Sequence, residues 1–186
     1  MKKIVVFASG SGTNAENIIK YFVGSESGTV VAVFTNNPTA KVIERAKNHE
    51  IQIEVFSKEE LIEGEVLHKI NRIKPDLIVL AGFLLKFPQN IIVSYPNKII
   101  NIHPALLPKY GGKGMYGMNV HKAIVENKEK ETGISIHYVN ENYDEGGVVF
   151  QKKVTLTGSE TPEDIAERIH ELEREFFPKV IAGLLE

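Results

Sequence analysis

An asparagine and a histidine stand two residues apart at the end of an apolar segment, in the sequence Asn101-Ile102-His103-Pro104. If this segment is a strand, Asn101 and His103 point to the same side of it, because side chains alternate along a strand. Pro104 then ends the hydrogen-bonding ladder and stiffens the exit of the chain. Acyl transfer needs such a pair, since both groups can stabilise the charge that develops on a carbonyl oxygen. Histidine can also exchange a proton near neutral pH.

A glycine-rich segment, Ser9-Gly-Ser-Gly-Thr-Asn14, follows the first apolar run and opens a helix-like one. Glycines let backbone N–H groups approach an oxyanion, and a helix N-terminus adds partial positive charge. The segment also fits a loose dinucleotide fingerprint, Gly10-x-Gly12-x-x-Ala15, but the second predicted strand ends at Asn36-Asn37 without the carboxylate that a nicotinamide ribose needs. The sequence therefore favours a monophosphate site, and a tight turn without a ligand is the alternative.

Two carboxylates complete the candidate site. Asp144 precedes a pair of glycines in an acidic loop, and we expect it to orient or polarise His103, because a carboxylate favours the charged imidazolium. Glu173 lies among apolar neighbours on one stripe of a long helix, one turn after His170, so it must be paired or face a cavity. The alternatives are a solvated acidic turn and a helix-edge salt bridge. We expect structural roles for the other histidines considered: His49, His68, His121 and His137.

The elements that must position these residues alternate between compact apolar runs and amphipathic segments. Parallel strands are predicted at residues 3–8, 29–35, 52–56, 76–81 and 98–103. Helices are predicted after the glycine loop, at 39–48, at 58–72, near residue 88, and from 161–162 to about 185. Two late strands without a helix between them, 132–139 and 148–156, predict an antiparallel extension. The pattern indicates a Rossmann-like three-layer α/β fold with a mostly parallel sheet.

Composition and charge narrow the class of protein. The chain has 186 residues, of which 42% are hydrophobic and 25% charged, which predicts a single soluble domain over residues 1–186. A net charge of -2 gives no reason to expect nucleic acid or an acidic membrane as partner. The absence of cysteine excludes disulfides and thiolate chemistry, and the histidines lack zinc-type spacing, so no metal is expected. No apolar stretch could span a bilayer, and we expect a cytoplasmic protein.

Three segments together resemble the motif set of the phosphoribosylglycinamide formyltransferase family: Ser9-Gly-Ser-Gly-Thr-Asn14, Asn101-Ile-His-Pro-Ala-Leu-Leu-Pro-Lys-Tyr110 and Asp144-Glu-Gly-Gly147. The resemblance runs over essentially the whole chain. It implies transfer of the formyl group of 10-formyltetrahydrofolate, the co-substrate, to the primary amine of N1-(5-phosphoribosyl)glycinamide in de novo purine biosynthesis. The amine would attack directly, Asn101 and a protonated His103 would stabilise the tetrahedral intermediate, and only small molecules would be bound. A monomer and a homodimer are both compatible with it.

The resemblance also assigns site residues by their place in the motifs. The catalytic residues are matched by Asn101, His103 and Asp144. The part that holds phosphate and ribose is matched by Gly12, Thr13, Asn14, His170 and Glu173. The folate pocket is matched by Leu84, Leu85, Lys86, Phe87, Ile92, Asn101, Asn140, Glu141, Tyr143 and Asp144.

The chain departs from this family pattern at three places. Leu85 stands where members often carry Arg, and His170 stands where some carry Lys. The segment 111–121 is longer than usual, so we expect a modified lid, and Lys113 within it is either a phosphate ligand or a solvated cation.

Other classes of protein share parts of this pattern. Methionyl-tRNA formyltransferase normally carries a further basic domain, formyltetrahydrofolate hydrolase a regulatory one, and amino-sugar formyltransferases additional nucleotide-binding parts, so we expect none of them. A non-catalytic nucleotide- or NAD-binding domain would account for the glycine loop. It would leave Asn101, His103 and Asp144 without a role.

Overall fold

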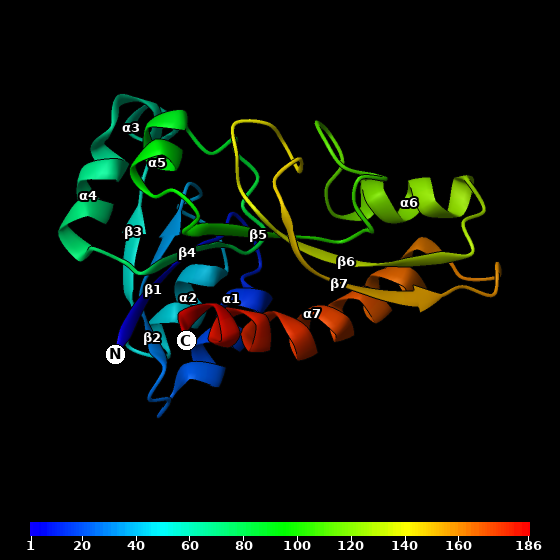
Figure 1. Ribbon diagram of the computed structural model, residues 1–186, viewed down its shortest axis with the longest axis horizontal. Helices are drawn as coiled ribbons and strands as arrows, with labels where there is room; N and C mark the ends of the chain where they lie inside the picture. The colour runs from blue at the N-terminus through cyan, green and yellow to red at the C-terminus, as the bar shows by residue number, and fades with distance from the viewer.

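A seven-stranded sheet forms the centre of the computed structural model, which describes residues 1–186 (Figure 1). Its strands are β1 (Lys2–Phe7), β2 (Gly28–Thr35), β3 (Gln52–Val55), β4 (Leu77–Leu80), β5 (Ile99–His103), β6 (Glu131–Tyr138) and β7 (Val148–Thr155). They lie in the order β3-β2-β1-β4-β5-β6-β7. The first five are parallel to one another, and β6 runs antiparallel to both of its neighbours, β5 and β7. The predicted fold class, including the antiparallel extension, is confirmed.

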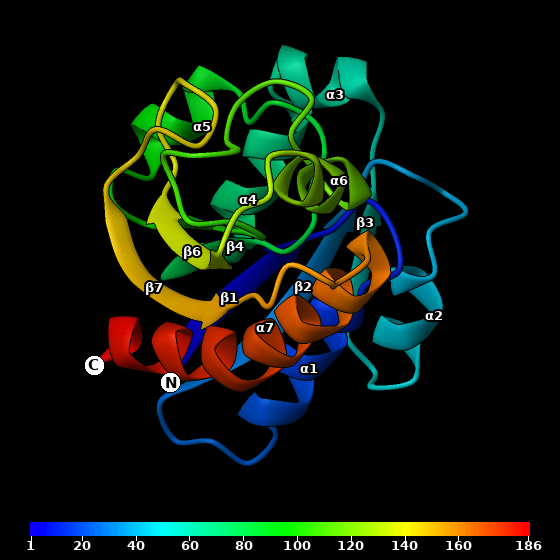
Figure 2. The same ribbon diagram turned by 90° about the vertical axis from the view of Figure 1, so that its right-hand side faces the viewer.

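Helices cover both faces of this sheet. They are α1 (Thr13–Phe22), α2 (Val42–Lys47), α3 (Lys58–Glu63), α4 (Glu65–Ile73), α5 (Gln89–Ser94), α6 (Met118–Glu126) and α7 (Pro162–Leu185). Figure 2 shows α3, α4 and α5 on one face and α1 and α7 on the other. No helix in the structure combines the length and the apolar character that crossing a membrane requires.

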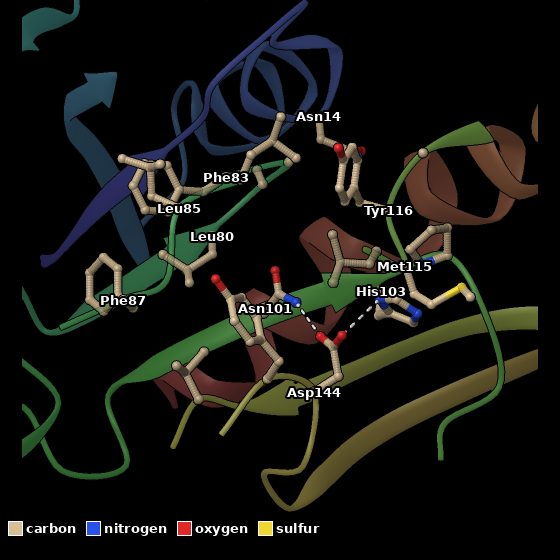
Figure 3. A pocket seen from close by; sticks show the side chains of 18 of the residues that line it. Asn14, Leu80, Phe83, Leu85, Phe87, Asn101, His103, Met115, Tyr116 and Asp144 are labelled. Atoms are coloured by element: carbon tan, nitrogen blue, oxygen red, sulfur yellow. Dashed lines mark hydrogen bonds and ion pairs between the residues drawn. The ribbon is translucent and has the colours of Figure 1, made fainter. Parts of the chain in front are cut away.

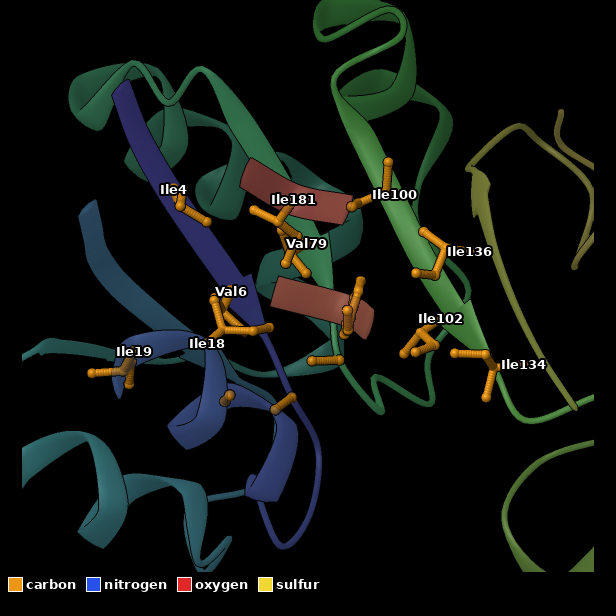
Figure 4. Packing of buried hydrophobic residues seen from close by; sticks show 14 of the residues in the cluster. Ile4, Val6, Ile18, Ile19, Val79, Ile100, Ile102, Ile134, Ile136 and Ile181 are labelled. Carbon is orange, nitrogen blue, oxygen red and sulfur yellow. The ribbon is translucent and has the colours of Figure 1, made fainter. Parts of the chain in front are cut away.

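Alternation along the strands divides the core between the two faces. In β1, Ile4 and Val6 join the cluster packed on α1 and α7, whereas Val5 and Phe7 join the one packed on α3, α4 and α5. All four side chains are fully buried, and each such burial stabilises the fold by roughly 1.5–3 kcal/mol. Figure 4 shows the first cluster, with Ile4 and Val6 beside residues of α1 and α7. Strands buried on both faces explain the continuous apolar runs of the sequence.

The chain winds in opposite directions from β1 and β4, which are neighbours in the sheet. Such a switch point leaves a crevice at the carboxyl ends of the two strands, where open α/β sheets bind their ligands. The loops that leave these strands are tied together here. The backbone N–H of Ser9 donates to the carbonyl of Gly82 at 3.1 Å, and the N–H of Leu84 donates to the Ser9 hydroxyl at 3.0 Å.

Two helices differ from the sequence-based prediction. The segment predicted as one helix over 58–72 is two, because Gly64 adopts a left-handed φ of 101° between α3 and α4. Helix α6 was not predicted. It begins after Gly117, which offers no side-chain cap, and glycine-rich sequence precedes it, so the usual N-terminal signal is missing.

Candidate active site

The crevice at the switch point opens into a cavity of about 680 Å³, a size typical of small-molecule sites. Figure 3 shows side chains from several elements turned into it. The walls come from segments that are far apart in the sequence: 10–14 after β1, 80–87 at the end of β4, 101–104 at the end of β5, 112–117 before α6, and 137–144 around the β6–β7 loop. The predicted phosphate, catalytic and folate segments therefore share one cavity.

The predicted catalytic residues converge at one wall of the cavity (Figure 3). The Asn101 amide nitrogen donates to Asp144 Oδ1 at 3.4 Å, and His103 Nδ1 lies 3.6 Å from Asp144 Oδ2. The β6–β7 loop carries Asp144 to the strand end, where it also accepts the backbone N–H of Gly112 at 3.0 Å. The structure thus brings the amide, the imidazole and the carboxylate together, as the sequence predicted.

Opposing influences act on the pKa of His103. Burial lowers the pKa of His103 below its ordinary value, because desolvation outweighs the opposing effects of the Asp144 carboxylate and the Tyr110 carbonyl. Its Nε2 lies 2.7 Å from that carbonyl, which can only accept, so Nε2 carries the hydrogen. The ring is then neutral near pH 7, with a bare Nδ1 facing Asp144. The predicted effect of Asp144 is present, since the carboxylate raises the pKa of His103, but burial is the larger effect in the free protein.

The carboxyl of Asp144 is ionised in the same environment. Burial by itself raises the pKa of Asp144, but the neighbouring His137 and His103 rings, when they are protonated, and the Gly112 N–H together hold it below its ordinary value. A buried carboxylate therefore stands 3.6 Å from a neutral imidazole. Such a pair is ready to accept a proton on His103, because the resulting imidazolium gains an ionic partner.

His137 also contacts this group, a position that the expectation of a structural role did not include. Its Nε2 lies 3.1 Å from the Asn101 amide nitrogen and 3.4 Å from Asp144 Oδ1. Its Nδ1 lies 2.9 Å from the carbonyl of Tyr138, so this nitrogen carries the hydrogen and Nε2 can accept from Asn101. The position of His137 in the site follows from the register of the β5–β6 pair, in which His137 lies directly opposite Asn101. Sequence alone does not supply that register.

The glycine loop at the opposite wall is held from outside by α2. Gly12 has a left-handed φ of 72°, and a Cβ there would come within 2.5 Å of the Val42 side chain. The Arg45 guanidinium donates from Nε to the Ser11 carbonyl at 2.9 Å and pairs with the Glu16 carboxylate. A glycine at position 12 is therefore required by both backbone angle and space. The loop presents the start of α1 to the cavity, as a phosphate site needs.

Glu173 lies beside this loop, 8% exposed, and accepts a hydrogen bond from the Asn14 amide at 2.9 Å. Burial raises the pKa of its carboxyl, although the Asn14 bond and the charge of His170 oppose the shift. Asn14, His170 and Glu173 all line the cavity. The prediction that Glu173 is paired and faces a cavity is confirmed, and the alternative of a helix-edge salt bridge is wrong.

Most of the predicted folate residues line the remaining part of the cavity: Leu84, Leu85, Lys86, Phe87, Asn140 and Tyr143. Two do not. Ile92 packs against the core cluster beneath α5, and Glu141 points to solvent. Other residues that line the cavity were not predicted from sequence: Phe83, Met115, Tyr116, His121 and Val139. Most are apolar or aromatic side chains on loops, which have no spacing pattern that marks them as ligand contacts.

Comparison with known proteins agrees with this architecture. The chain matches the Formyl transferase family over residues 2–181, and it belongs to that family. It is 35% identical to phosphoribosylglycinamide formyltransferase of Escherichia coli (strain K12), covering 96% of this chain and 85% of the relative. The enzyme of the same name from Bacillus subtilis (strain 168) is 34% identical, over 100% of this chain and 95% of the relative.

Plant relatives and solved structures extend the comparison. The chain is 36% identical to the chloroplastic phosphoribosylglycinamide formyltransferase of Arabidopsis thaliana and spans 66% of its length; it spans 61% of the Vigna unguiculata relative. The crystal structure of glycinamide ribonucleotide transformylase 1 from Geobacillus kaustophilus superposes with a TM-score of 0.91 at 35% identity, covering all of both chains. The phosphoribosylglycinamide formyltransferase structure from Bacillus halodurans gives 0.89 at 34% identity, over 100% and 96% of the two chains.

Proposed function

We propose that this protein transfers the formyl group of 10-formyltetrahydrofolate to the primary amine of N1-(5-phosphoribosyl)glycinamide, as a phosphoribosylglycinamide formyltransferase of de novo purine biosynthesis. The products are the N-formyl compound and tetrahydrofolate. One observation carries the proposal: Asn101, His103 and Asp144 converge in the same cavity that the glycine loop closes at its other end. The names of the similar proteins, at 34–36% identity, support it.

In this proposal the phosphate anchors the phosphorylated substrate at one end of the cavity. The N–H groups at the start of α1, around Gly12, Thr13 and Asn14, receive the phosphate, because a helix N-terminus favours an anion. Glu173 and His170 hold the ribose part from α7. The glycinamide amine then reaches toward Asn101 and His103 across the cavity.

The formyl carbon is attacked directly by the amine, and a tetrahedral intermediate forms. Asn101 stabilises its oxyanion: one amide N–H is anchored to His137 at 3.1 Å, and the other makes only a long 3.4 Å contact with Asp144, so it can turn to the formyl oxygen. The bare Nδ1 of His103 takes a proton from the attacking nitrogen, directly or through water. The imidazolium is held by Asp144 and returns that proton to the folate nitrogen as the carbon–nitrogen bond to the folate breaks.

The folate occupies the half of the cavity between β4 and the β6–β7 loop in this proposal. Phe87 and Leu85 offer apolar surface there, and Asn140 and Tyr143 form the opposite rim. Lys86 lies 6.0 Å from the centre of the Tyr143 ring, close to the mouth of the cavity. Since position 85 carries no cation in this chain, we assign the folate carboxylate to Lys86, which lines the cavity.

We further propose that residues 1–186 act as one catalytic domain in the cytoplasm and bind small molecules. A monomer and a homodimer would both leave the cavity complete, because every residue assigned above comes from one chain.

Incubation with N1-(5-phosphoribosyl)glycinamide and 10-formyltetrahydrofolate tests the proposal. Absorbance should report loss of the formyl-folate, and mass spectrometry should show the formylated amine in equal amount. Loss of formyl-folate without the formylated amine would indicate hydrolysis and contradict the proposal. Addition of NAD in place of formyl-folate serves as the control for the dinucleotide alternative, and no binding is expected.

A further inference from the structure

His121 is a buried imidazole that the mechanism above does not use and that has no partner inside the protein. It lies on α6, is 3% exposed, and its ring lines the main cavity. Its Nδ1 atom is fully buried without a hydrogen-bond partner. Its Nε2 atom, at the far end of the ring, has no hydrogen bond within the protein and is not among the fully buried unpaired atoms, and the residue lines the cavity. Buried polar groups left unpaired are rare and require an explanation.

His121 lines the same cavity as residues from both halves of the site. Burial, reinforced by the neighbouring imidazoles of His170 and then His103, lowers the pKa of His121 to about 4. His170 lies at the phosphate end, beside Glu173, and His103 belongs to the group that acts on the formyl carbon. No carboxylate is among the groups that act on His121. His121 therefore shares the cavity with both of these imidazoles, and no anion of the protein is among the groups that act on it.

One nitrogen of this neutral ring carries a hydrogen. A hydrogen on Nδ1 would be a buried donor without an acceptor. Leaving this donor unpaired costs more free energy than leaving the lone pair of a bare Nδ1 unpaired. The hydrogen therefore belongs on Nε2, where it faces the cavity. A ligand with an oxygen at this position would satisfy the only donor of His121.

We infer that His121 is an additional substrate-binding residue whose Nε2–H donates a hydrogen bond to a phosphate oxygen of the phosphorylated substrate. The identity of that substrate rests on the proposed function, but the contact itself requires only a phosphate monoester. A phosphate suits the position better than a hydroxyl, because hydrogen bonds to an ionised acceptor are roughly twice as strong as neutral ones. No carboxylate is among the groups that act on His121, so none of them would repel a phosphate there.

Two substitutions distinguish the ring nitrogens. His121→Gln keeps an N–H donor near the position of Nε2, whereas His121→Asn keeps one near the position of Nδ1. Binding of ribose 5-phosphate, measured by titration calorimetry, should weaken roughly tenfold in His121→Asn and stay within about threefold of wild type in His121→Gln. The matched control is His68→Gln on α4, a solvent-exposed histidine outside the cavity, which should bind as wild type does.

Wild-type affinity in His121→Asn, or an equal loss in both variants, would overturn the assignment to Nε2. If His121→Asn fails to fold, the ring hydrogens of His121 in the wild-type protein supply the test, since their NMR signals are identified by their absence in His121→Gln. Ribose 5-phosphate should shift them, and unmoved signals at saturation would overturn the inference. These readouts need no formyl transfer. A protein that binds ribose 5-phosphate through His121 but forms no formylated amine would uphold this inference and contradict the proposed function.

Discussion

The two ends of the cavity are built in different ways. The phosphate end is local: β1, the glycine loop and the start of α1 follow one another in the sequence, and backbone groups make the site. The proposed acyl-transfer end is assembled from side chains that lie far apart in the sequence, with Asp144 43 positions and His137 36 positions after Asn101. A local site can be recognised from a short motif, whereas a distributed one depends on how the sheet is paired.

The largest expected effect is at the acyl-transfer end. Asn101→Ala and His103→Ala should each lower kcat by ~100- to 1000-fold, because removal of one donor to an oxyanion commonly costs this much. KM for the phosphorylated substrate should change little, since the phosphate end is intact. Thermal unfolding of both variants should be close to wild type, which separates chemistry from folding. Near-normal turnover in either variant would contradict the assignment.

Asp144→Asn should lower kcat by about 100-fold, in the range expected for proton transfer. It should also move the pH profile. In the proposed mechanism the neutral form of His103 is the active one, so kcat/KM of the wild type should fall as the pH drops through a pKa below 6.5. The Asp144 carboxylate raises the pKa of His103, so its removal should shift this acid limb to still lower pH. A shift to higher pH would contradict the pairing of these two residues.

At the phosphate end, Gly12→Ala should mainly raise KM, by roughly tenfold, because the new Cβ would lie 2.5 Å from Val42 and the left-handed backbone costs about 1–2 kcal/mol. The matched control is Gly10→Ala. A Cβ at Gly10 meets nothing within 4 Å, so KM and the unfolding midpoint should stay near wild type. Equal effects of the two substitutions would show that the shape of the loop against α2 does not matter.

The smallest expected effect concerns a residue that supports the catalytic end through its backbone. The phenol of Tyr110 donates to Glu129 at 2.9 Å, and its carbonyl accepts from His103. Tyr110→Phe removes the anchor and should lower kcat by about 3- to 10-fold, the value of one hydrogen bond, with KM unchanged.

The matched control for Tyr110→Phe is Lys109→Ala. This substitution removes the other Glu129 contact, at 3.0 Å, without touching Tyr110. Its kcat should equal that of wild type. A similar loss of kcat in both variants would indicate that Glu129 acts only through the stability of this region.

The sequence predicted the local features well and the distributed ones in part. Buried strands, the glycine loop and the Asn101–His103 pair each leave a short pattern that alternation or spacing explains. The role of His137 depends on its register opposite Asn101, and the lowered pKa of His103 depends on burial by the whole fold. Helix α6, with His121, lacks an N-cap signal. Contacts of this kind are set by tertiary packing, which no local pattern encodes.

The central claim is that both ends of the cavity act on one substrate. It is tested most directly by kcat/KM for N1-(5-phosphoribosyl)glycinamide and for the corresponding riboside without phosphate, measured in wild type and in Gly12→Ala. We predict that the wild type prefers the phosphorylated substrate by roughly 100-fold, about 2.7 kcal/mol, and that Gly12→Ala loses most of this preference. An equal kcat/KM for the two substrates in the wild type would contradict the account.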